Sequence, residues 1–338
     1  MRCLTHGRSS VFALEPNDRV LIGDRPYFLN RVARGGMGCV LLLRIDRQRA
    51  PKTVDALGSS IALKAVLPDA AGEKSFALFK RELTIWSGLR HPNVISLLEI
   101  LDGGDAGPLA AMTWCSGSLR EILNTHTRLS IEDSTAITCD IIHGLSNAYE
   151  RDKVLHLDLK PENVLYDFDL SLRLAHGNDP KTVLKTYKYM LSDWGIASIK
   201  QRYLNAIVAL GGNAVSGNYT FNNMGTPVYM APERFVQGTH ATLASDVFSL
   251  GMMYFEMLIG RLPFREGMNP IQSILSGQYI EDATALIRTE SVSSSVGQVI
   301  LNMLAFAPSD RPANYSSLRA RIMRASNSTK GFFARLLK

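Results

Sequence analysis

The chain has 338 residues, of which 46% are hydrophobic and 20% are charged, so it can bury a sizeable core in one large domain or in two packed lobes. Its net charge of +6 is local, because the segment from Arg311 to Lys338 holds seven basic and no acidic residues. The remainder is close to neutral, which argues against a nucleic-acid-binding protein with a basic face on its main domain.

No stretch of the sequence has the features of a membrane-spanning or secretory segment. The longest apolar stretch, residues 247–260, is too short to cross a bilayer and contains Glu256. The N-terminus lacks the apolar core of a secretory signal, although Arg2 and Arg8 leave an organelle-targeting segment as an alternative.

The cysteines indicate the redox environment. Four are present, namely Cys3, Cys39, Cys115 and Cys139. None forms a CxxC pair, and no histidine cluster supplies further metal ligands. We therefore expect neither a zinc site nor a disulfide framework, and we predict a reducing, cytoplasmic location.

The first third of the chain is rich in strand signals. Residues 1–25 show no clear period and are expected to form an N-terminal extension. Apolar residues recur every three or four positions from Lys74 to Arg90, which predicts a helix. A small, mostly antiparallel sheet is expected from strands within residues 27–45, 61–67, 94–101 and 108–114.

The rest of the chain is expected to be mainly helical. Residues 131–151 have an apolar face of helical spacing, and residues 244–260 are apolar nearly all round, which predicts a buried helix. Residues 170–188 and 198–222 are expected to be insertions or mobile loops. We predict an extension at residues 1–25, a main domain at 26–325 that divides into 26–115 and 116–325, and a basic tail at 326–338.

Two features of the β-rich part favour phosphate binding. Gly35 and Gly38, between two strands, would let the backbone approach a phosphate, although taken alone they are better explained by a glycine-rich hairpin turn. Lys64 lies among apolar strand residues, where an unpaired ammonium is costly. An ion pair with Glu82 would hold that ammonium ready for phosphate oxygens; the alternative is a strand-edge lysine that reaches water.

The stretch "VLHLDLKPENVLYDF" concentrates polar side chains between apolar runs. Asp158 can accept a proton from a hydroxyl, Lys160 can meet a phosphoryl group, and Asn163 has an oxygen suited to Mg²⁺. Asp193, in "LSDWGIAS", follows an expected strand and precedes a glycine. Each residue alone could be a cap or turn residue, but their joint order matches the needs of phosphoryl transfer.

Over about residues 27–325 the sequence resembles the eukaryotic-type protein kinases. The segments that resemble motifs of this family are "HLDLKPEN", "SDWG", "GTPVYMAPE", "SDVFSLG" and "DRP". The resemblance implies an α+β fold of two lobes, a small β-rich one with one helix and a larger, mainly helical one. It implies Asp158 as catalytic base, Asn163 and Asp193 as Mg²⁺ ligands, and Lys160 at the γ-phosphate of ATP. Lys64, positioned by Glu82, would hold the α- and β-phosphates.

The resemblance also assigns binding and anchoring residues. Asp246 would anchor the backbone of the catalytic loop, and Arg311 would pair with Glu233. Met112 would be the gatekeeper, with the backbone around Thr113 to Cys115 binding adenine. ATP is expected between the lobes, and its implied binding residues are Ala33, Gly35, Gly38, Val40, Ala62, Lys64, Met112, Thr113 and Cys115.

The substrate class follows from two further positions. Lys160 and Thr226 resemble the Ser/Thr-specific branch, so protein serine and threonine hydroxyls are the expected substrates. Leu157 stands where the family often has an arginine that pairs with a phosphorylated residue of the activation segment. Without that partner, we expect activity that does not depend strongly on phosphorylation there.

Other departures keep alternatives open. Ala33 replaces the first glycine of the nucleotide loop, which is tolerable if its φ is negative, and Trp194 replaces a phenylalanine. Together with Leu157 they leave a pseudokinase, acting as a nucleotide-binding scaffold, as the alternative function. A kinase-fold enzyme for small molecules is a third reading, against which "GTPVYMAPE" argues. The tail from Ser328 could contact an anionic membrane, dock on its own lobe or be disordered.

Overall fold

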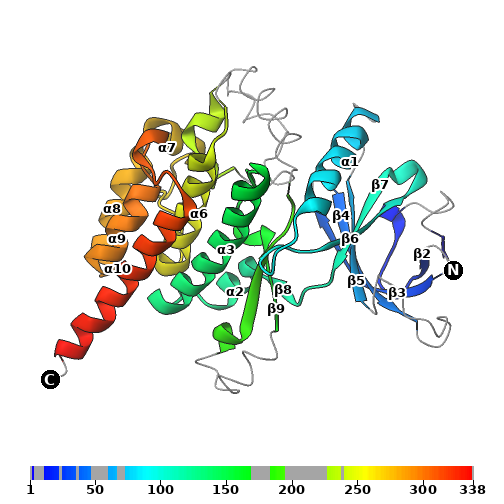
Figure 1. Cartoon of the computed structure of the whole chain (residues 1–338), viewed down its shortest axis with the longest axis horizontal. Coiled ribbons are helices and arrows are strands. Elements are labelled where there is room, and N and C mark those ends of the chain that lie inside the picture. The colour runs from blue at the N-terminus through cyan, green and yellow to red at the C-terminus, as the bar shows by residue number, and fades with distance from the viewer. Residues whose placement is uncertain are drawn as a thin grey trace. The chain divides into compact units, whose positions relative to one another are not determined.

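The computed structural model of the chain describes residues 2–3, 11–22, 25–35, 38–46, 60–66, 73–168, 183–194, 227–236 and 240–336. These residues form two compact units, whose elements are labelled in Figure 1. Unit 1 contains the described residues up to Arg90, residues 95–115 and Trp194, whereas unit 2 contains residues 91–94, 116–193 and those from Pro227 onward. Unit 1 is built mainly from strands and unit 2 mainly from helices, which confirms the predicted α+β class.

Unit 1 contains a seven-stranded sheet, antiparallel except for its first pair. In spatial order the strands are β1 (Arg2–Cys3), β2 (Arg19–Ile22), β3 (Arg25–Gly35), β4 (Gly38–Ile45), β5 (Ser60–Val66), β7 (Pro108–Thr113) and β6 (Leu97–Asp102). The strands expected from residue 27 onward are confirmed, but the fourth begins only at Leu97, because Val94 forms a bridge with Leu191 instead. β1 and β2 were not expected as strands.

One face of this sheet packs into the apolar core of unit 1. Alternate residues of each strand point to the same face, and Leu41, Leu43 and Leu63 on this face are fully buried. Leu14, which follows the 3-10 turn Val11–Ala13, joins the same cluster. The segment before residue 26 therefore contributes core as well as strands, while the exact domain boundaries stay predictions.

Helix α1 (Glu73–Gly88) packs against β6 and β7. Phe79, Leu83 and Trp86 are each only 1% exposed, and their spacing of four and three residues places them on one helical face. The Trp86 indole nitrogen donates a hydrogen bond to the backbone oxygen of Ile95, at 2.8 Å. The helix expected from Lys74 is thus confirmed, and its apolar face is the buried one.

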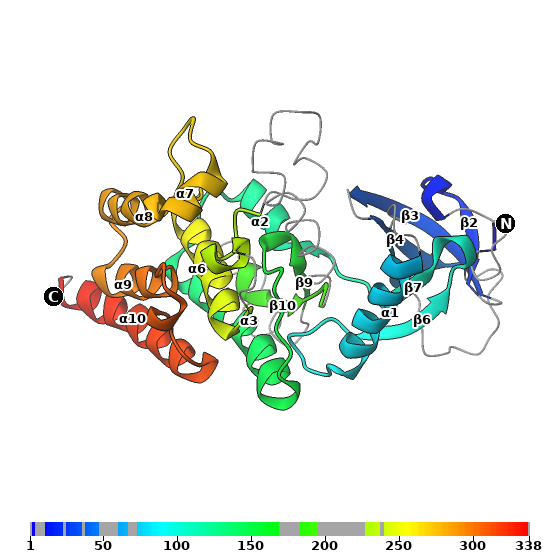
Figure 2. The same cartoon turned by 90° about the horizontal axis from the view of Figure 1, so that it is seen from above.

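Unit 2 is a helical body, whose helices are labelled in Figure 2, with a three-stranded sheet of order β10-β9-β8. Its strands are β8 (Gly117–Ser118), β9 (Val164–Phe168) and β10 (Tyr187–Leu191). Its helices are α2 (Leu119–Thr125), α3 (Ile131–Asp152), α6 (Leu243–Ile259), α7 (Pro270–Ser276), α8 (Gln278–Thr289), α9 (Ser294–Met303) and α10 (Tyr315–Leu336). α3 packs against α6, α10 and β10.

α6 is the central helix of unit 2 and the one predicted from residues 244–260. All but one of its seventeen residues are buried, including two acids, Asp246 and Glu256. It contacts α3, α8 and α9, so no side of it faces solvent. An acid buried in such a helix needs donors from elsewhere in the chain, and the site described below supplies them.

The two predicted insertions lie mostly outside the described residues. β9 ends at Phe168 and β10 begins at Tyr187, so the last residues of the insertion expected at 170–188 belong to a strand. A 3-10 turn, Val183–Thr186, precedes that strand. The insertion expected at 198–222 and the side chains from Thr329 onward lie outside the described residues, while the backbone of α10 continues through the predicted tail to Leu336.

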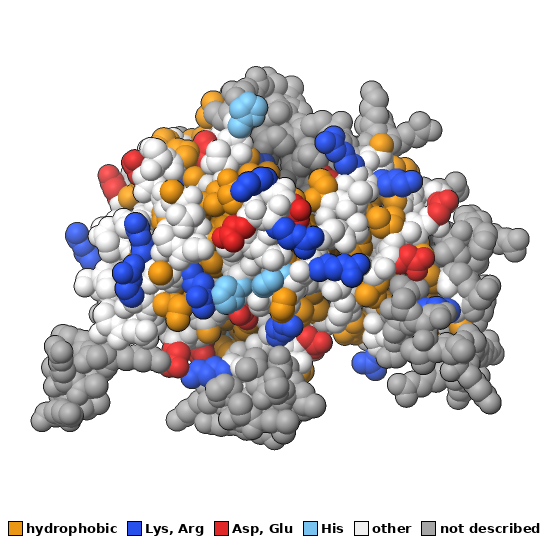
Figure 3. Space-filling model, in the orientation of Figure 1, with side chains coloured by type: hydrophobic (Ala, Val, Ile, Leu, Met, Phe, Trp, Pro, Cys, Tyr) orange, Lys and Arg blue, Asp and Glu red, His pale blue; other side chains and the backbone are white. Residues whose placement is uncertain are grey.

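Among the described residues, none of the helices combines the length and apolarity needed to cross a bilayer. On the face seen in Figure 3, Lys and Arg side chains lie among acidic and uncharged ones. Neither sign of charge covers this face alone.

We predict that Gly144→Ala destabilises unit 2. A Cβ at Gly144, on α3, would lie 2.7 Å from the backbone oxygen of Asn93 and 3.1 Å from Cδ1 of Leu191. The clash should cost about 1–3 kcal/mol and lower Tm by roughly 2–8 °C in thermal unfolding. The matched control is Gly88→Ala in α1, where a Cβ meets nothing within 4 Å and stability should stay equal or rise. Equal effects of both variants would contradict the close packing described.

Candidate active site

Two of the predicted catalytic residues, Asp158 and Lys160, and one predicted metal ligand, Asn163, lie together in unit 2 on the loop between α3 and β9. The Asn163 side-chain nitrogen donates to the Asp158 backbone oxygen and to its carboxylate Oδ2, each at 2.8 Å. The Lys160 ammonium lies 3.3 Å from the same Oδ2. A 3-10 turn, Pro161–Asn163, brings Asn163 back toward Asp158. The loop therefore fixes the carboxylate beside one amide and one cation.

This arrangement would let Asp158 accept a proton while Lys160 stabilises negative charge on a neighbouring group. The Asp158 and Lys160 side chains keep 13% and 21% of their surface exposed, so both can be reached by a substrate. A carboxylate that is oriented by an amide can accept a proton from a hydroxyl within hydrogen-bonding reach. A neighbouring ammonium favours negative charge on the group being attacked.

Asp193 is tied to the same loop through the residue before it. The Ser192 backbone nitrogen donates to the Asn163 backbone oxygen at 2.9 Å, and the Ser192 hydroxyl donates to the same oxygen at 3.1 Å. The His156 Nε2 lies 2.9 Å from the Ser192 backbone oxygen. Because that oxygen can only accept, Nε2 carries the proton. Asp193 therefore follows directly on a residue that is held by Asn163 and His156.

His156 serves this loop as a neutral imidazole. Its side chain is fully buried, and burial lowers its pKa despite the nearby carboxylates. Its Nδ1, which has no proton in this tautomer, accepts from the Asp158 backbone nitrogen at 3.4 Å. His156 therefore joins the Asp158 backbone to Ser192 without adding a charge.

The backbone at this site adopts an uncommon conformation. Leu157 and Asp193 have φ angles of +62° and +63°, in the left-handed region that costs a non-glycine residue roughly 1–2 kcal/mol. Such residues persist only where the surroundings hold them. For Leu157 the holding group is the Asp246 carboxylate of α6, which accepts from the Leu157 nitrogen at 2.7 Å and from the His156 nitrogen at 2.8 Å. The anchoring role predicted for Asp246 is confirmed.

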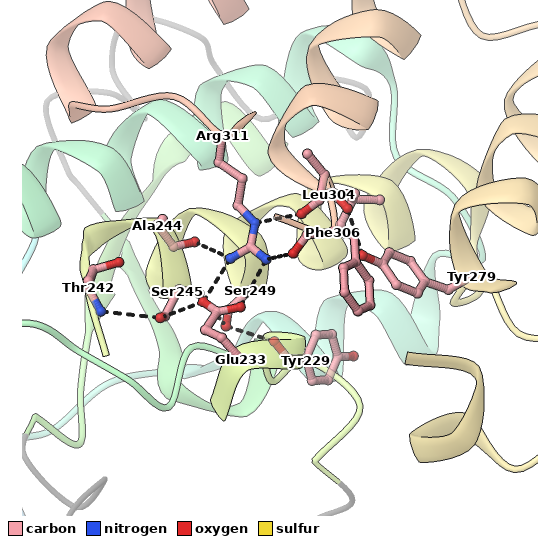
Figure 4. A network of polar contacts seen from close by, with 11 residues as sticks. Tyr229, Glu233, Thr242, Ala244, Ser245, Ser249, Tyr279, Leu304, Phe306 and Arg311 are labelled. Carbon is pink, nitrogen blue, oxygen red and sulfur yellow. Dashed lines mark hydrogen bonds and ion pairs between the residues drawn. The ribbon is translucent and has the colours of Figure 1, made fainter. Parts of the chain in front are cut away.

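A buried ion pair fastens the segment that precedes α6 (Figure 4). Arg311 donates to both carboxylate oxygens of Glu233, at 2.9 and 3.0 Å, and to the backbone oxygens of Ala244, Ala305 and Phe306. The Arg311 side chain is fully buried. Every acceptor is therefore matched by a guanidinium hydrogen, as a buried charge requires, and the pairing predicted from "APE" and "DRP" is confirmed.

A second charge network was not predicted. Arg120, from α2, contacts Glu162 of the catalytic loop at 2.8 Å and Glu256 of α6 at 2.7 Å, and it donates to the Tyr229 hydroxyl. Tyr229 in turn donates to Glu256. Burial alone would lower the pKa of Arg120, but the bonds to Glu256 raise it. Glu256, an acid within an apolar helix, was the sequence signal that could have indicated such a partner.

In unit 1, five of the predicted nucleotide-binding residues share one face of the sheet. Ala33 lies opposite Val40, Val40 opposite Lys64, and Ala62 opposite Met112. Directly paired residues point to the same face, and Ala62 and Lys64 are separated by one residue of the core face. All five therefore point away from that core. Ala33 lies in β3 without a positive φ, so the methyl group is accommodated.

The structure also describes the surroundings of Glu82, Lys64, Gly35 and Gly38 in unit 1. Glu82 of α1 is 4% exposed and Lys64 is partly buried; their ion pair stays a prediction. Gly35 pairs with Gly38 at the end of the β3–β4 hairpin. A Cβ at Gly38 would lie 2.0 Å from the Ala65 backbone oxygen, so packing against β5 is enough to require glycine there.

The positions expected to bind adenine lie at the end of β7 and just after it. Met112 is 3% exposed, Thr113 ends β7, and Cys115 ends the segment of residues 95–115 that belongs to unit 1. Among the described residues, Cys39 and Cys139 have free thiols.

Comparison with known proteins identifies the family. The sequence model of the protein kinase domain matches residues 34–323, which is most of the chain, and the chain therefore belongs to the eukaryotic-type protein kinase family. It is 26% identical over 314 residues to the serine/threonine-protein kinase PrkC of Bacillus subtilis, with 91% of this chain and 42% of PrkC aligned. It is 27% identical over 301 residues to the serine/threonine-protein kinase PknB of Mycobacterium tuberculosis, with 87% of this chain and 41% of PknB aligned.

A solved structure supports the fold. The crystal structure of Rad53 residues 1–466 in complex with AMP-PNP matches with a TM-score of 0.60 and 19% identity, covering 88% of this chain and 64% of that one. This confirms the protein kinase fold. The chain spans less than half the length of the curated relatives PrkC and PknB.

We predict that Arg311→Ala destabilises unit 2 by about 3–5 kcal/mol, because it removes the buried guanidinium that donates to the Glu233 carboxylate and to three backbone carbonyl groups. The control is Arg128→Ala, which removes an ion pair to Glu290 at 2.6 Å whose side chains are 50% and 30% exposed. That exposed pair should contribute less than about 1 kcal/mol. Thermal unfolding measures both, and similar losses of Tm would contradict the importance given to the buried pair.

Proposed function

We propose that the chain is a Mg²⁺-dependent serine/threonine protein kinase that transfers the γ-phosphate of ATP to protein hydroxyls. The observation that carries the proposal is the cluster of Asp158, Lys160 and Asn163, with Asp193 attached through Ser192. Family membership supports it, as do the names of PrkC and PknB and the AMP-PNP bound to Rad53. Phosphoryl transfer needs positioned charge more than covalent chemistry, which is what this cluster offers.

In this proposal each side chain of the cluster has one task. Asp158 accepts the proton of the attacking hydroxyl, because its carboxylate is oriented by Asn163 and partly exposed. Lys160, which lies 3.3 Å from that carboxylate, neutralises the transferring phosphoryl group. The charge of Lys160 thus lies beside the proton acceptor, as in-line transfer to a hydroxyl requires.

The donor set near Asn163 fits Mg²⁺. Within the described part of the chain, the Asn163 side chain makes both of its hydrogen bonds through its nitrogen, which leaves the amide oxygen for a cation, and the Asp193 carboxylate is a second hard ligand. Among the described residues, no three His, Cys, Asp or Glu side chains gather as a metal site. A cation that completes its coordination with substrate phosphates and water needs no such cluster. When bound, Mg²⁺ would neutralise phosphate charge.

Unit 1 would bind the rest of the nucleotide. The face that carries Ala33, Val40, Ala62 and Met112 is apolar and suits the adenine ring, with the backbone of Thr113 to Cys115 as hydrogen-bonding partner. Lys64 on the same face would hold the α- and β-phosphates, positioned by Glu82. Gly35 and Gly38 would leave room for phosphate.

The proposal includes the substrate class and the location. Lys160 and Thr226 favour serine and threonine, and proteins are the expected substrates; Thr226 lies outside the described residues. Tyr229, within "GTPVYMAPE", is bonded to Glu256 and Arg120, so the segment expected to meet a peptide is fastened to α6. A cytoplasmic location is proposed because the cysteine spacing suggests neither a disulfide framework nor a zinc site.

Activity should not depend strongly on phosphorylation of the activation segment. The side chain at residue 157 is apolar, and what the loop uses at this position is the backbone nitrogen, which donates to Asp246. A phosphate on the segment would find no guanidinium at this position.

We predict that Asp158→Asn abolishes transfer without abolishing nucleotide binding. With labelled ATP, Mg²⁺ and a generic basic protein, the rate should fall about a hundredfold or more, because the proton acceptor loses its charge. Asp152→Asn, at the end of α3 with 43% of its side chain exposed, is the matched control and should retain activity. ATP binding by wild type without any transfer would instead indicate a nucleotide-binding scaffold.

We predict that the combined variant Ser216→Ala, Tyr219→Phe and Thr220→Val keeps its rate within about threefold of wild type, because no arginine at residue 157 reads a phosphate there. These three residues lie outside the described residues. The same transfer assay measures the rate, and thermal unfolding checks that the variant is folded. A large loss of activity in a folded variant would contradict the predicted independence.

A further inference from the structure

The Asp246 carboxylate has a third donor that comes from the last helix of the chain. The Tyr315 hydroxyl donates to Asp246 Oδ2 at 3.3 Å, on the same oxygen that accepts from the His156 nitrogen. We propose that Tyr315 is a positioning residue for the catalytic loop, which acts through Asp246. This inference rests on the proposed kinase function, because it assigns a role in that reaction to a residue of α10 that touches neither nucleotide nor substrate.

The hydroxyl of Tyr315 is held in place by its surroundings. Tyr315 is the first residue of α10 and is 1% exposed, and its ring meets the ring of Tyr149 of α3 edge-on, with centroids 6.1 Å apart. Leu318 and Ile322, three and seven residues on, are fully buried on the same helix. Four residues earlier, Arg311 is fixed by Glu233. The packing around Tyr315 therefore holds its hydroxyl beside Asp246.

The position of the Asp246 carboxylate matters because of what it holds. It is fully buried, and burial raises its pKa, while the facing His156 and Arg234 and the two backbone donors oppose that rise. One of those donors belongs to Leu157, whose positive φ has to be maintained. Asp158 is the next residue, so a rotation of the carboxylate would displace the proposed proton acceptor. A third donor restricts that rotation.

The expected effect is moderate. At 3.3 Å the bond is longer than the backbone bonds of 2.7 and 2.8 Å, and longer than most bonds between a hydroxyl and an oxygen. Its loss should shift the loop and lower kcat about threefold to tenfold, without changing the residues proposed to bind ATP.

The test compares Tyr315→Phe with Tyr254→Phe in the full chain. Tyr254 is also 1% exposed, and its hydroxyl lies 2.9 Å from that of Thr135, so the control loses a buried hydroxyl bond that does not involve Asp246. We measure kcat, KM for Mg-ATP and hydrogen exchange of the peptide that contains His156 and Leu157. Tyr315→Phe should lower kcat with KM for Mg-ATP within about twofold, and should speed exchange of that peptide. Tyr254→Phe should do neither.

Two results would overturn the inference. One is a Tyr315→Phe variant with the kcat and the exchange of wild type, and the other is an equal loss in Tyr254→Phe, which would show a general packing effect. A wild type that transfers no phosphate would refute the proposed function instead. In that case the exchange of the His156–Leu157 peptide still decides whether Tyr315 positions the loop.

Discussion

One buried carboxylate holds the candidate active site together. Asp246 lies on α6 with no exposed surface, and it accepts from two consecutive backbone nitrogens of the catalytic loop. A loop with little regular structure leaves buried backbone donors that need acceptors from other parts of the chain, and Leu157 adds a left-handed conformation to that cost. The Asp246 carboxylate accepts from these backbone nitrogens and helps to maintain the left-handed conformation of Leu157, because an ionised acceptor makes stronger hydrogen bonds than a neutral one. The positions of Asp158 and Asn163 follow from this anchor.

α6 can supply that anchor because it is otherwise apolar and enclosed. A buried charge stabilises a structure only when its partners are in place, and both acids of α6 have partners far along the chain. Asp246 is met from the catalytic loop and from α10, and Glu256 is met by Arg120 and Tyr229. The Glu233–Arg311 pair fastens the segment just before the helix. The arrangement of unit 2 thus depends on a few buried ion pairs and hydrogen-bonded charges as well as on its apolar core.

The sequence predicted what local patterns encode. α1 was recognisable because its apolar residues repeat with a helix period, α6 because it is apolar nearly all round, and Asp246 and Arg311 were assigned because motifs carry them. β2 was missed because four residues between turns show no period. Arg120 and Tyr315 were missed for a different reason: their partners lie up to 136 residues away, and nothing near them in the sequence indicates a contact. The pairing of Lys64 with Glu82 stays a prediction.

The departures from the family pattern are compatible with a working site. Ala33 occupies an extended position in β3, where an added methyl group causes no backbone strain. Gly38, in contrast, cannot carry a side chain because β5 approaches too closely. At Leu157 the structural task belongs to the backbone nitrogen and to a positive φ, neither of which depends on an arginine side chain. The replacement therefore leaves the anchor of the catalytic loop intact, and under the proposed function it would remove a binding partner for phosphate without disturbing that anchor.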